Sequence, residues 1–580
     1  MSKMTDSTKK TIKTLAILFA VIAVFVVGML ITMTIAHFSL KDGTGFNGAG
    51  VVFYLKRVII DNFLGVNAFL IGSIVFIGYL VLGRGIRDAI LGFIKSAIGI
   101  LVLSIGSGIL VGMSKEIFVQ ISKLGAGVTS LDPYTGWTSA ENFLKALNGQ
   151  NVSAFISYAL LIGFAINLTL VVFRRWTNVH SIMLTGHVMF QQSAMVVAGT
   201  TVSLFLSNTA LSYGAQTGII LISGLILGLY WGIGSTATIK GSDAVTQGAG
   251  FCVGHQQMLG LSLAYKIGRF FGKKEQSAEN MVLPKKLKVF EDNIFTQSLI
   301  MLILFTILIA IIAAKNPIGS VFDGQSYKWT KVLLPNWAVD GNVFFIFNIL
   351  LGALKLVGSI LVIQTGVRMF VSELQQSFQG ITEKVAPGAV VAVDVAATYG
   401  FSSNSVTYGF VSGTIAQFIA TGLLIGLSQI NFGPHFKLDI TIPLFITLFF
   451  NSGSIGVFAN ASGGFKAALI VPAIFGFGEI LLSSLGLSLL KMHEAFVQNA
   501  PKVSDAAHVF GTGYLGMFDW NVFFAPMMGF GSLHPVVGGI VFTGAIGSLV
   551  AFSQIVDSGR QSEPTFLQKM FKLNIQTYNH

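Results

Sequence analysis

The chain has 580 residues, of which 53% are hydrophobic and only 10% are charged, and its mean hydropathy is +0.76. Soluble proteins carry about 25% charged residues, so this composition excludes a string of water-soluble domains and predicts an all-α membrane protein that crosses the bilayer many times. The formal net charge of +12 comes from basic residues in short loops and at the chain ends, which indicates positive-inside topology and argues against a nucleic-acid-binding protein.

The first predicted element is an N-terminal extension, residues 1–61, with one extra spanning helix. Lys9, Lys10 and Lys13 precede the uncharged run 15–36. This run is longer than the ~7–15-residue apolar core of a signal peptide, so we expect an uncleaved helix whose N-terminus is cytoplasmic. Arg84, after the next predicted span at 62–82, indicates the same orientation.

The hydropathy pattern predicts eleven or twelve transmembrane helices plus re-entrant segments. The longest uncharged run, 176–239, has 64 residues and as one helix would reach ~96 Å, so it must double back or contain a re-entrant piece. Its candidate break points are Gly186, Gly214, Gly232 and Gly234. The other predicted spans are 90–112, 153–173, 295–314, 343–363, 401–426, 438–450, 467–489 and 535–556.

Charged loops complete the predicted topology. Residues 266–292 are the most charged internal segment and are expected in the cytoplasm, either as a solvated topogenic loop or as a docking surface for a cytosolic partner. Residues 315–341 are then an external loop, and residues 557–580 form a cytoplasmic tail. We expect residues 62–556 to form one integrated membrane domain.

An internal repeat relates the two halves of the chain. At an offset of 260, residues 91–121 match residues 351–381 without gaps at 10 of 31 positions, including Lys95 with Lys355. On the predicted topology the two copies start at opposite faces of the membrane. Such inverted repeats place the substrate of many transporters between the halves, near the bilayer midplane.

Four polar clusters interrupt apolar segments and are candidate binding groups. His187 and Gln191 are four residues apart and would share one helix face. Their side chains could form a structural bond between helices or contact a ligand, and the sequence favours neither role. The stretch 254–257, Gly-His-Gln-Gln, is equally ambiguous alone. Asp394 is an acid at membrane depth, which indicates function. The stretch 131–134 follows the first repeat copy as Asp394 follows the second, although alone it would be taken for an external turn.

This inventory of amides, imidazoles, carboxylates and a phenol suits a small, hydroxyl-rich, sugar-like ligand held by directional hydrogen bonds. It indicates no metal site, because His187 and His255 lack further ligands at fixed spacing, and no ATPase, because the phosphate-binding loop motif is absent. No cofactor is expected. Cys252, the single cysteine, has no basic residue within ten positions to activate it and is interpreted as a buried structural thiol.

Four sequence segments carry a resemblance to a known family: residues 182–192 (Ile-Met-Leu-Thr-Gly-His-Val-Met-Phe-Gln-Gln), 254–257, 365–374 (Thr-Gly-Val-Arg-Met-Phe-Val-Ser-Glu-Leu) and 456–460 (Gly-Val-Phe-Ala-Asn). They closely resemble the ascorbate-specific enzyme IIC component of the bacterial phosphotransferase system. The resemblance runs from about residue 62 to residue 556. It implies a homodimeric permease of the bacterial cell membrane, with a core domain and a V-shaped domain built from inverted repeats, that moves L-ascorbate inward by an elevator-like motion.

The resemblance also implies the substrate contacts. Carried over position by position, they fall on Pro133, Tyr134, His187, Val188, Met189, Phe190, Gln191, His255, Gln256 and Asp394. Pro133 departs from the threonine of the ascorbate carriers, which leaves the exact substrate open. The resemblance says nothing about the N-terminal helix or the loop 315–341.

In such a system a cytosolic enzyme IIB phosphorylates the sugar, and enzyme IIA supplies IIB. Neither domain is recognisable in this chain, so both are expected as separate polypeptides, with the basic loop near Lys273 as the candidate docking surface. We expect no phosphoryl-transfer residue here, which leaves open whether the chain counts as an enzyme. The alternatives are a phosphotransferase permease for another sugar acid or polyol, such as galactitol or a pentitol, and a facilitator or sensor that works without IIB. An intramembrane enzyme is disfavoured by the missing nucleophile–base pair.

Overall fold

The computed structural model describes residues 26–35, 48–54, 58, 63, 66–122, 128–148, 153–205, 212–281, 293–315, 334–337, 345–430, 438–496, 513–531 and 534–575. The chain divides into two compact units, Met1–Leu70 and Ile71–His580. The smaller unit contains the apolar helix Val26–Ile35 and α2 (Gly48–Phe53). Only the C-terminal part of the predicted N-terminal helix therefore lies within the described residues.

The larger unit is dominated by long apolar helices. Seven described segments are long and apolar enough to cross a membrane, and four shorter apolar helices have 10–17 residues. The prediction of a helical protein with many membrane spans is confirmed. Two small parallel sheets lie among the helices, and these strands were not predicted.

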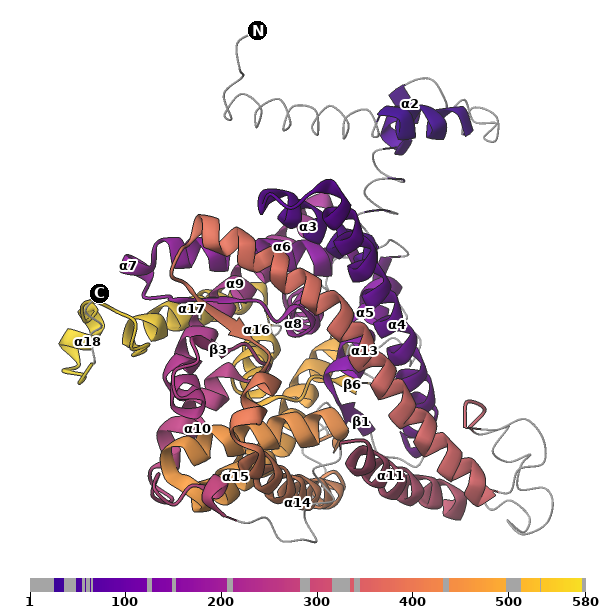
Figure 1. Cartoon of the computed structure of the whole chain (residues 1–580). Coiled ribbons are helices and arrows are strands. Elements are labelled where there is room, and N and C mark those ends of the chain that lie inside the picture. Colours follow the sequence, from indigo (N-terminus) through magenta and orange to yellow (C-terminus); the bar gives the residue numbers. More distant parts are fainter. Residues whose placement is uncertain are drawn as a thin grey trace. The chain divides into compact units, whose positions relative to one another are not determined.

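One set of helices packs mainly within itself along one side of this unit (Figure 1). We call it the α4–α13 group, and it consists of α3 (Asn67–Val81), α4 (Ile86–Ser122), α11 (Asn293–Lys315) and α13 (Phe345–Val385). Glu373 of α13 links this helix to α3 and α4. Its carboxylate accepts a hydrogen bond from the Tyr79 hydroxyl at 2.5 Å and pairs with the Lys95 ammonium at 3.2 Å.

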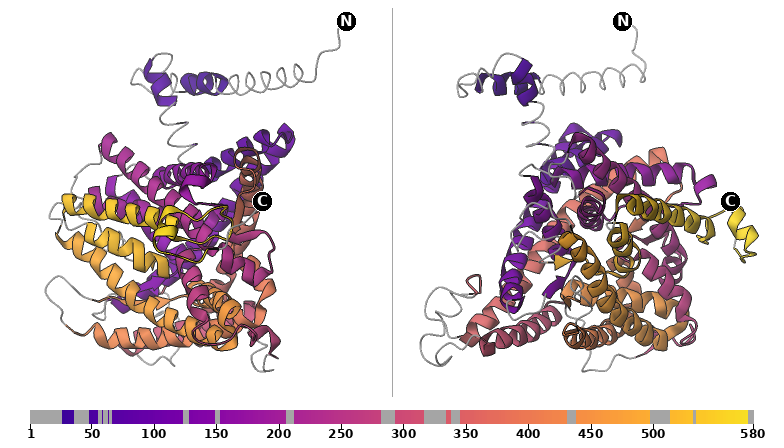
Figure 2. Two further views of the ribbon diagram at one scale, coloured as in Figure 1. Left: turned by 90° about the vertical axis from the view of Figure 1, so that its left-hand side faces the viewer. Right: turned by 180° about the vertical axis from the view of Figure 1, so that it is seen from behind.

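The remaining long helices form a second set, the α8–α15 group, which Figure 2 shows from two further sides. Its helices are α5 (Pro133–Asn148), α6 (Ser153–Val172), α8 (Gly186–Thr200), η2 (Thr201–Phe205), α9 (Tyr213–Thr246), α10 (Met258–Gly268), α14 (Ser403–Leu427), η6 (Thr447–Asn451), α15 (Ser452–Phe496), η8 (Trp520–Phe524), α16 (Ala525–Gly531) and α17 (Pro535–Ile555). The short helices are α7 (Arg174–Thr177), η3 (Ala278–Asn280), η5 (Val395–Phe401) and α18 (Phe566–Met570).

The two sheets exchange strands between the halves of the chain. Their strands are β1 (Val128–Leu131), β2 (Ser181–Met183), β3 (Phe251–Val253), β4 (Val390–Val393), β5 (Ile440–Pro443) and β6 (Gly513–Tyr514). One sheet has the order β5-β1-β6 and the other β2-β4-β3, and all pairs are parallel. Each sheet therefore takes its central strand from one half and its outer strands from the other, as expected for a duplicated fold.

Several predicted boundaries differ from the structure. Residues 438–450 were predicted as a span, but they contain β5 and the start of η6; an apolar run of this length suits a buried strand as well as a helix. Gly186 begins α8 as predicted, whereas Gly232 and Gly234 lie inside the continuous helix α9. The break that periodicity missed is at Gly464 in α15, where φ is +67°, a conformation that favours glycine.

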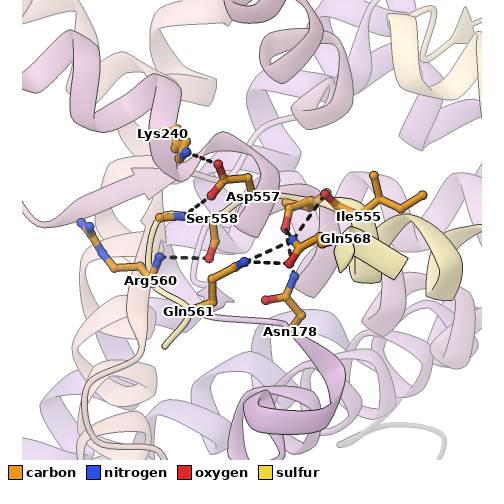
Figure 3. Close-up of polar contacts among 10 residues, drawn as sticks. Asn178, Lys240, Ile555, Asp557, Ser558, Arg560, Gln561 and Gln568 are labelled. Atoms are coloured by element: carbon orange, nitrogen blue, oxygen red, sulfur yellow. Dashed lines mark hydrogen bonds and ion pairs between the residues drawn. The ribbon is translucent and has the colours of Figure 1, made fainter. Parts of the chain in front are cut away.

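The C-terminal segment that follows α17 is tied to α9 and to the loop after α7 (Figure 3). Lys240 forms an ion pair with Asp557, and Arg560 pairs with Asp243 at 3.0 Å. The Asn178 amide donates to the carbonyl oxygens of residues 553 and 556 at 2.8 and 2.9 Å. The first part of the predicted tail is therefore held against the α8–α15 group.

The close crossing of α4 and α13 yields a test of packing. A Cβ atom on Gly366 would lie 2.4 Å from the Leu103 nitrogen and 2.6 Å from the Gly99 oxygen, whereas one on Gly358 of the same helix would meet nothing within 4 Å. We expect Gly366→Ala to destabilise the protein by about 1–3 kcal/mol, because backbone atoms must move apart, while Gly358→Ala leaves stability equal or higher. Thermal unfolding in detergent can be followed by the reaction of buried Cys252 with a thiol-reactive dye. Equal melting temperatures for the two variants would contradict this account of the crossing.

Candidate functional site

The three strands of the β2-β4-β3 sheet end at one edge and deliver polar residues there. Pairing of Met183 with Ala392, and of Val253 with Val393, aligns the carboxyl ends of the strands. His187 follows β2, His255 follows β3 and Asp394 follows β4 directly. Because parallel strands share their carboxyl edge, residues that are far apart in the sequence converge in space.

His187 and Asp394 form the centre of this edge. The His187 Nε2 atom lies 3.1 Å from an Asp394 carboxylate oxygen, and the side chains are 13% and 32% exposed. Asp394 also accepts a hydrogen bond from the Ala396 backbone N–H at 3.0 Å, which caps η5. His187 lies in the first turn of α8, where the helix dipole favours a nearby anion. The carboxylate is thus partnered but still accessible.

Three glutamines lie beside this centre. The Gln256 amide donates to the Gln191 side-chain oxygen at 2.6 Å. Gln192 faces the other way: its oxygen accepts from the Trp231 indole at 2.6 Å, and its amide donates to the His255 carbonyl at 3.3 Å. Gln191 and Gln256 therefore meet at the site, while Gln192 anchors the backbone of the His255 loop, by which we mean residues 254–257.

Tyr134 joins the site from the other sheet. Its phenol interacts with Gln191 and electrostatically with Asp394. Tyr134 is placed by Asp132, which follows β1 and whose carboxylate accepts from the Tyr134 backbone N–H at 2.8 Å. Pro133 is buried at the first position of α5, where a backbone N–H has no intrahelical partner, so proline costs the helix no hydrogen bond.

The apolar residues carried over with this site have a packing role. Val188, Met189 and Phe190 are at most 6% exposed in the first turns of α8. The Phe190 ring meets the Trp137 ring edge-on at 5.2 Å. In the apolar segment that α8 and η2 form, 89% of the residues are buried, against 22% in α17. The side chains of α8 therefore face protein rather than lipid.

Several buried polar atoms around the site lack a partner among the described residues. They are His187 Nδ1, His255 Nδ1, Gln256 Oε1, Thr185 Oγ1 and Trp137 Nε1. Leaving a buried polar group unpaired costs about 1–3 kcal/mol, so a cluster of mixed donors and acceptors at one place indicates a polar solute as the missing partner.

Thr185 and Trp137 were not among the predicted site residues. Thr185 lies between β2 and α8. Its position two residues before His187 could have indicated that it belongs to the site. Trp137 lies three residues after Tyr134 on the same helix, so helical spacing could have indicated it. Within the described part of the chain, no three His, Cys, Asp or Glu side chains are grouped as a metal site would require.

Two titratable groups near the site belong to the scaffold. His180 contacts the Asn178 side chain at 3.2 Å, and burial, with Arg174 and Arg560 nearby, lowers the pKa of His180 to about 4. It is therefore neutral at physiological pH. Cys252 in β3 is fully buried, as expected for an unreactive structural thiol.

The chain has several helices that are long and apolar enough to span a membrane, and these helices surround a half-buried polar site. Such an arrangement is typical of a membrane carrier for a small polar solute. Residues 62–526 match the family described as the PTS system sugar-specific permease component, EIIC-GAT, and the chain belongs to this family. It is 42% identical over 615 aligned positions, covering 91% of each chain, to the "Ascorbate-specific PTS system EIIC component" of Mycoplasma pneumoniae.

The family expected from the sequence motifs is thereby confirmed. The protein is a multi-pass membrane permease component of a phosphotransferase system, and membership implies a sugar substrate and partner IIA and IIB components.

The central pair yields a test of the site. We expect His187→Ala and Asp394→Asn each to weaken substrate binding about ten- to a hundred-fold or more and to abolish uptake, because each removes a hydrogen bond to a charged group worth about 1.5–3 kcal/mol. His180→Ala is the matched control and should keep both activities, since His180 faces Asn178. Binding and uptake should be measured on folded protein. Normal transport by both site variants would show that the site is elsewhere.

Proposed function

We propose that this protein binds L-ascorbate and carries it inward across the bacterial cell membrane, where a separate enzyme IIB phosphorylates it. The convergence of His187, His255 and Asp394 at the edge of one sheet is the observation that carries the proposal. Gln191, Gln256 and Tyr134 add directional donors and acceptors. The name of the Mycoplasma pneumoniae relative supports ascorbate as the solute.

The chemistry of ascorbate suits this site. The molecule is small and carries oxygens all around, which need donors and acceptors in about equal measure. The atoms that lack a protein partner offer the Trp137 N–H as a donor, the Gln256 oxygen as an acceptor, and imidazole nitrogens and a hydroxyl that can serve as either. Pro133 removes a threonine hydroxyl, yet its place at the start of α5 leaves Tyr134 in the site.

The transport motion we propose is a displacement of the α8–α15 group, which holds the site, against the α4–α13 group. The tight packing of each group within itself supports two bodies. We further propose a homodimer embedded in the lipid bilayer, with a cytoplasmic N-terminus. Residues 1–61 would form the N-terminal extension with its extra helix, 62–556 the permease domain, and 557–580 a cytoplasmic tail.

Purified protein tests the substrate. Labelled ascorbate should bind saturably, and galactitol or a pentitol in excess should not compete, because a polyol lacks the planar ring whose oxygens the site is proposed to hold. In vesicles with IIA, IIB and a phosphoryl donor, the product inside should be a phosphorylated ascorbate. Competition by a polyol would identify a different sugar permease. Unmodified ascorbate as the product would identify a facilitator.

The docking surface for IIB is testable in the same vesicles. Lys273 and Lys274 are exposed in the basic loop, beside Phe270, which is 73% exposed and stacked on by Arg269. Exposed aromatic and basic residues of this kind are typical of interface anchors. We expect the double change to glutamate at 273 and 274 to raise the KM for phosphorylated IIB several-fold while ascorbate affinity stays the same. The double change to glutamate at Lys569 and Lys572, both exposed at the end of α18, is the charge-matched control. An equal effect there would mean that net charge, rather than this loop, governs the encounter.

A further inference from the structure

A buried carboxylate lies directly behind the His255 loop. Asp519 is 1% exposed, and its Oδ2 atom accepts hydrogen bonds from the Tyr230 hydroxyl at 2.5 Å and from the Leu259 N–H at 2.7 Å. Its Oδ1 atom accepts from the Gly260 N–H at 2.8 Å. Three donors thus converge on one acid that the sequence analysis did not identify.

Two of these donors are the N–H groups of the second and third residues of α10, which begins at Met258 directly after the His255 loop. The N-terminal N–H groups of a helix have no partner within the helix, and the positive end of its dipole favours a carboxylate. Asp519 therefore fixes where α10 starts. A Cβ atom on Gly260 would lie 3.0 Å from the Phe518 ring, so the glycine lets the acid's own loop approach this closely.

The third donor lies against the loop itself. The Tyr230 hydroxyl, fixed by Asp519, also lies 3.3 Å from the Gln256 carbonyl oxygen. The Gln256 side chain in turn donates to Gln191. Two hydrogen bonds to α10, and the position of the Tyr230 hydroxyl beside the loop, therefore depend on the same carboxylate.

Asp519 belongs to the second half of the chain, in the segment between β6 and η8, whereas the His255 loop belongs to the first half. We infer that Asp519 is a positioning residue for substrate binding: it does not touch the solute but holds His255 and Gln256 at the site from the other repeat. This inference rests on the proposed function for its ligand.

The test compares Asp519→Asn and Tyr230→Phe with Asp557→Asn in the full-length protein. Asp557 is the control carboxylate because it also accepts from a backbone N–H, while its side-chain partner is Lys240 instead of a residue that contacts the His255 loop. We expect Asp519→Asn to weaken ascorbate affinity about ten- to a hundred-fold, because an amide cannot accept from all three donors. Tyr230→Phe should have a smaller effect, and the control none. In uptake assays KM should rise with little change in kcat.

A measurement that needs no ligand helps to distinguish a positioning role of Asp519 from a purely structural one. Hydrogen exchange should increase in the peptide spanning residues 254–262 of Asp519→Asn, and not in other helices. A purely structural role would lower the melting temperature but leave the affinity of the folded fraction unchanged, and that result would overturn the inference. Unchanged exchange in this peptide would overturn it too. Failure of the parent protein to bind ascorbate would instead overturn the proposed function, while the exchange result would still decide whether Asp519 holds the loop.

Discussion

The fold depends on one constraint, which is that backbone polar groups at membrane depth must find partners. Where helices break in the middle of this protein, short parallel strands supply those partners. The hydrogen bonds continue past the strands: the Leu184 N–H donates to the Ala392 carbonyl at 2.9 Å, and the Gly254 N–H donates to the Val393 carbonyl at 2.7 Å. The strand exchange thus joins the two halves of the chain beside the candidate site.

The two sheets have matching strand orders, but the polar side chains of the candidate site follow the strands of one sheet. The β2-β4-β3 edge carries His187, His255 and Asp394. At the other edge, β5 is followed by Leu444 and Phe445, which are at most 1% exposed. The carboxylate of Asp132, which follows β1 as Asp394 follows β4, accepts a hydrogen bond from the Tyr134 backbone N–H. The β5-β1-β6 sheet therefore contributes Tyr134 to the candidate site at the edge of the other sheet.

The sequence was informative where side-chain chemistry is unusual for its surroundings. A histidine or an acid in an apolar run is conspicuous, so the polar members of the site could be predicted, and the structure brings His187 and Asp394 into contact. The strands could not be predicted, because three or four apolar residues between helices have no distinctive periodicity. Asp519 escaped notice for a different reason: its partners are backbone N–H groups and a tyrosine in distant segments, which leave no local pattern.

One residue from each of two family motifs makes contacts that hold helices and loops together. Gly366, in the segment 365–374, permits the close crossing of α13 with α4. Asn460, in the segment 456–460, accepts from the Ala278 N–H at 2.9 Å and donates to Ser277 at 3.0 Å, which fastens the basic loop to α15. A motif therefore identifies the family without saying which of its residues meet the solute. Only the convergence in space separates them.

The same geometry restricts how the proposed carrier could move. β4 is hydrogen-bonded on both sides to strands of the α8–α15 group, so Asp394 must travel with that group, although it follows α13 of the other group. In this connection, a displacement between the groups would be absorbed between the end of α13 and the start of β4. There Gly388 has a φ of +80°, and Arg174 donates to the Pro387 carbonyl at 3.1 Å. The site can then stay rigid while its connection bends, which is what carrying a solute held by directional hydrogen bonds requires.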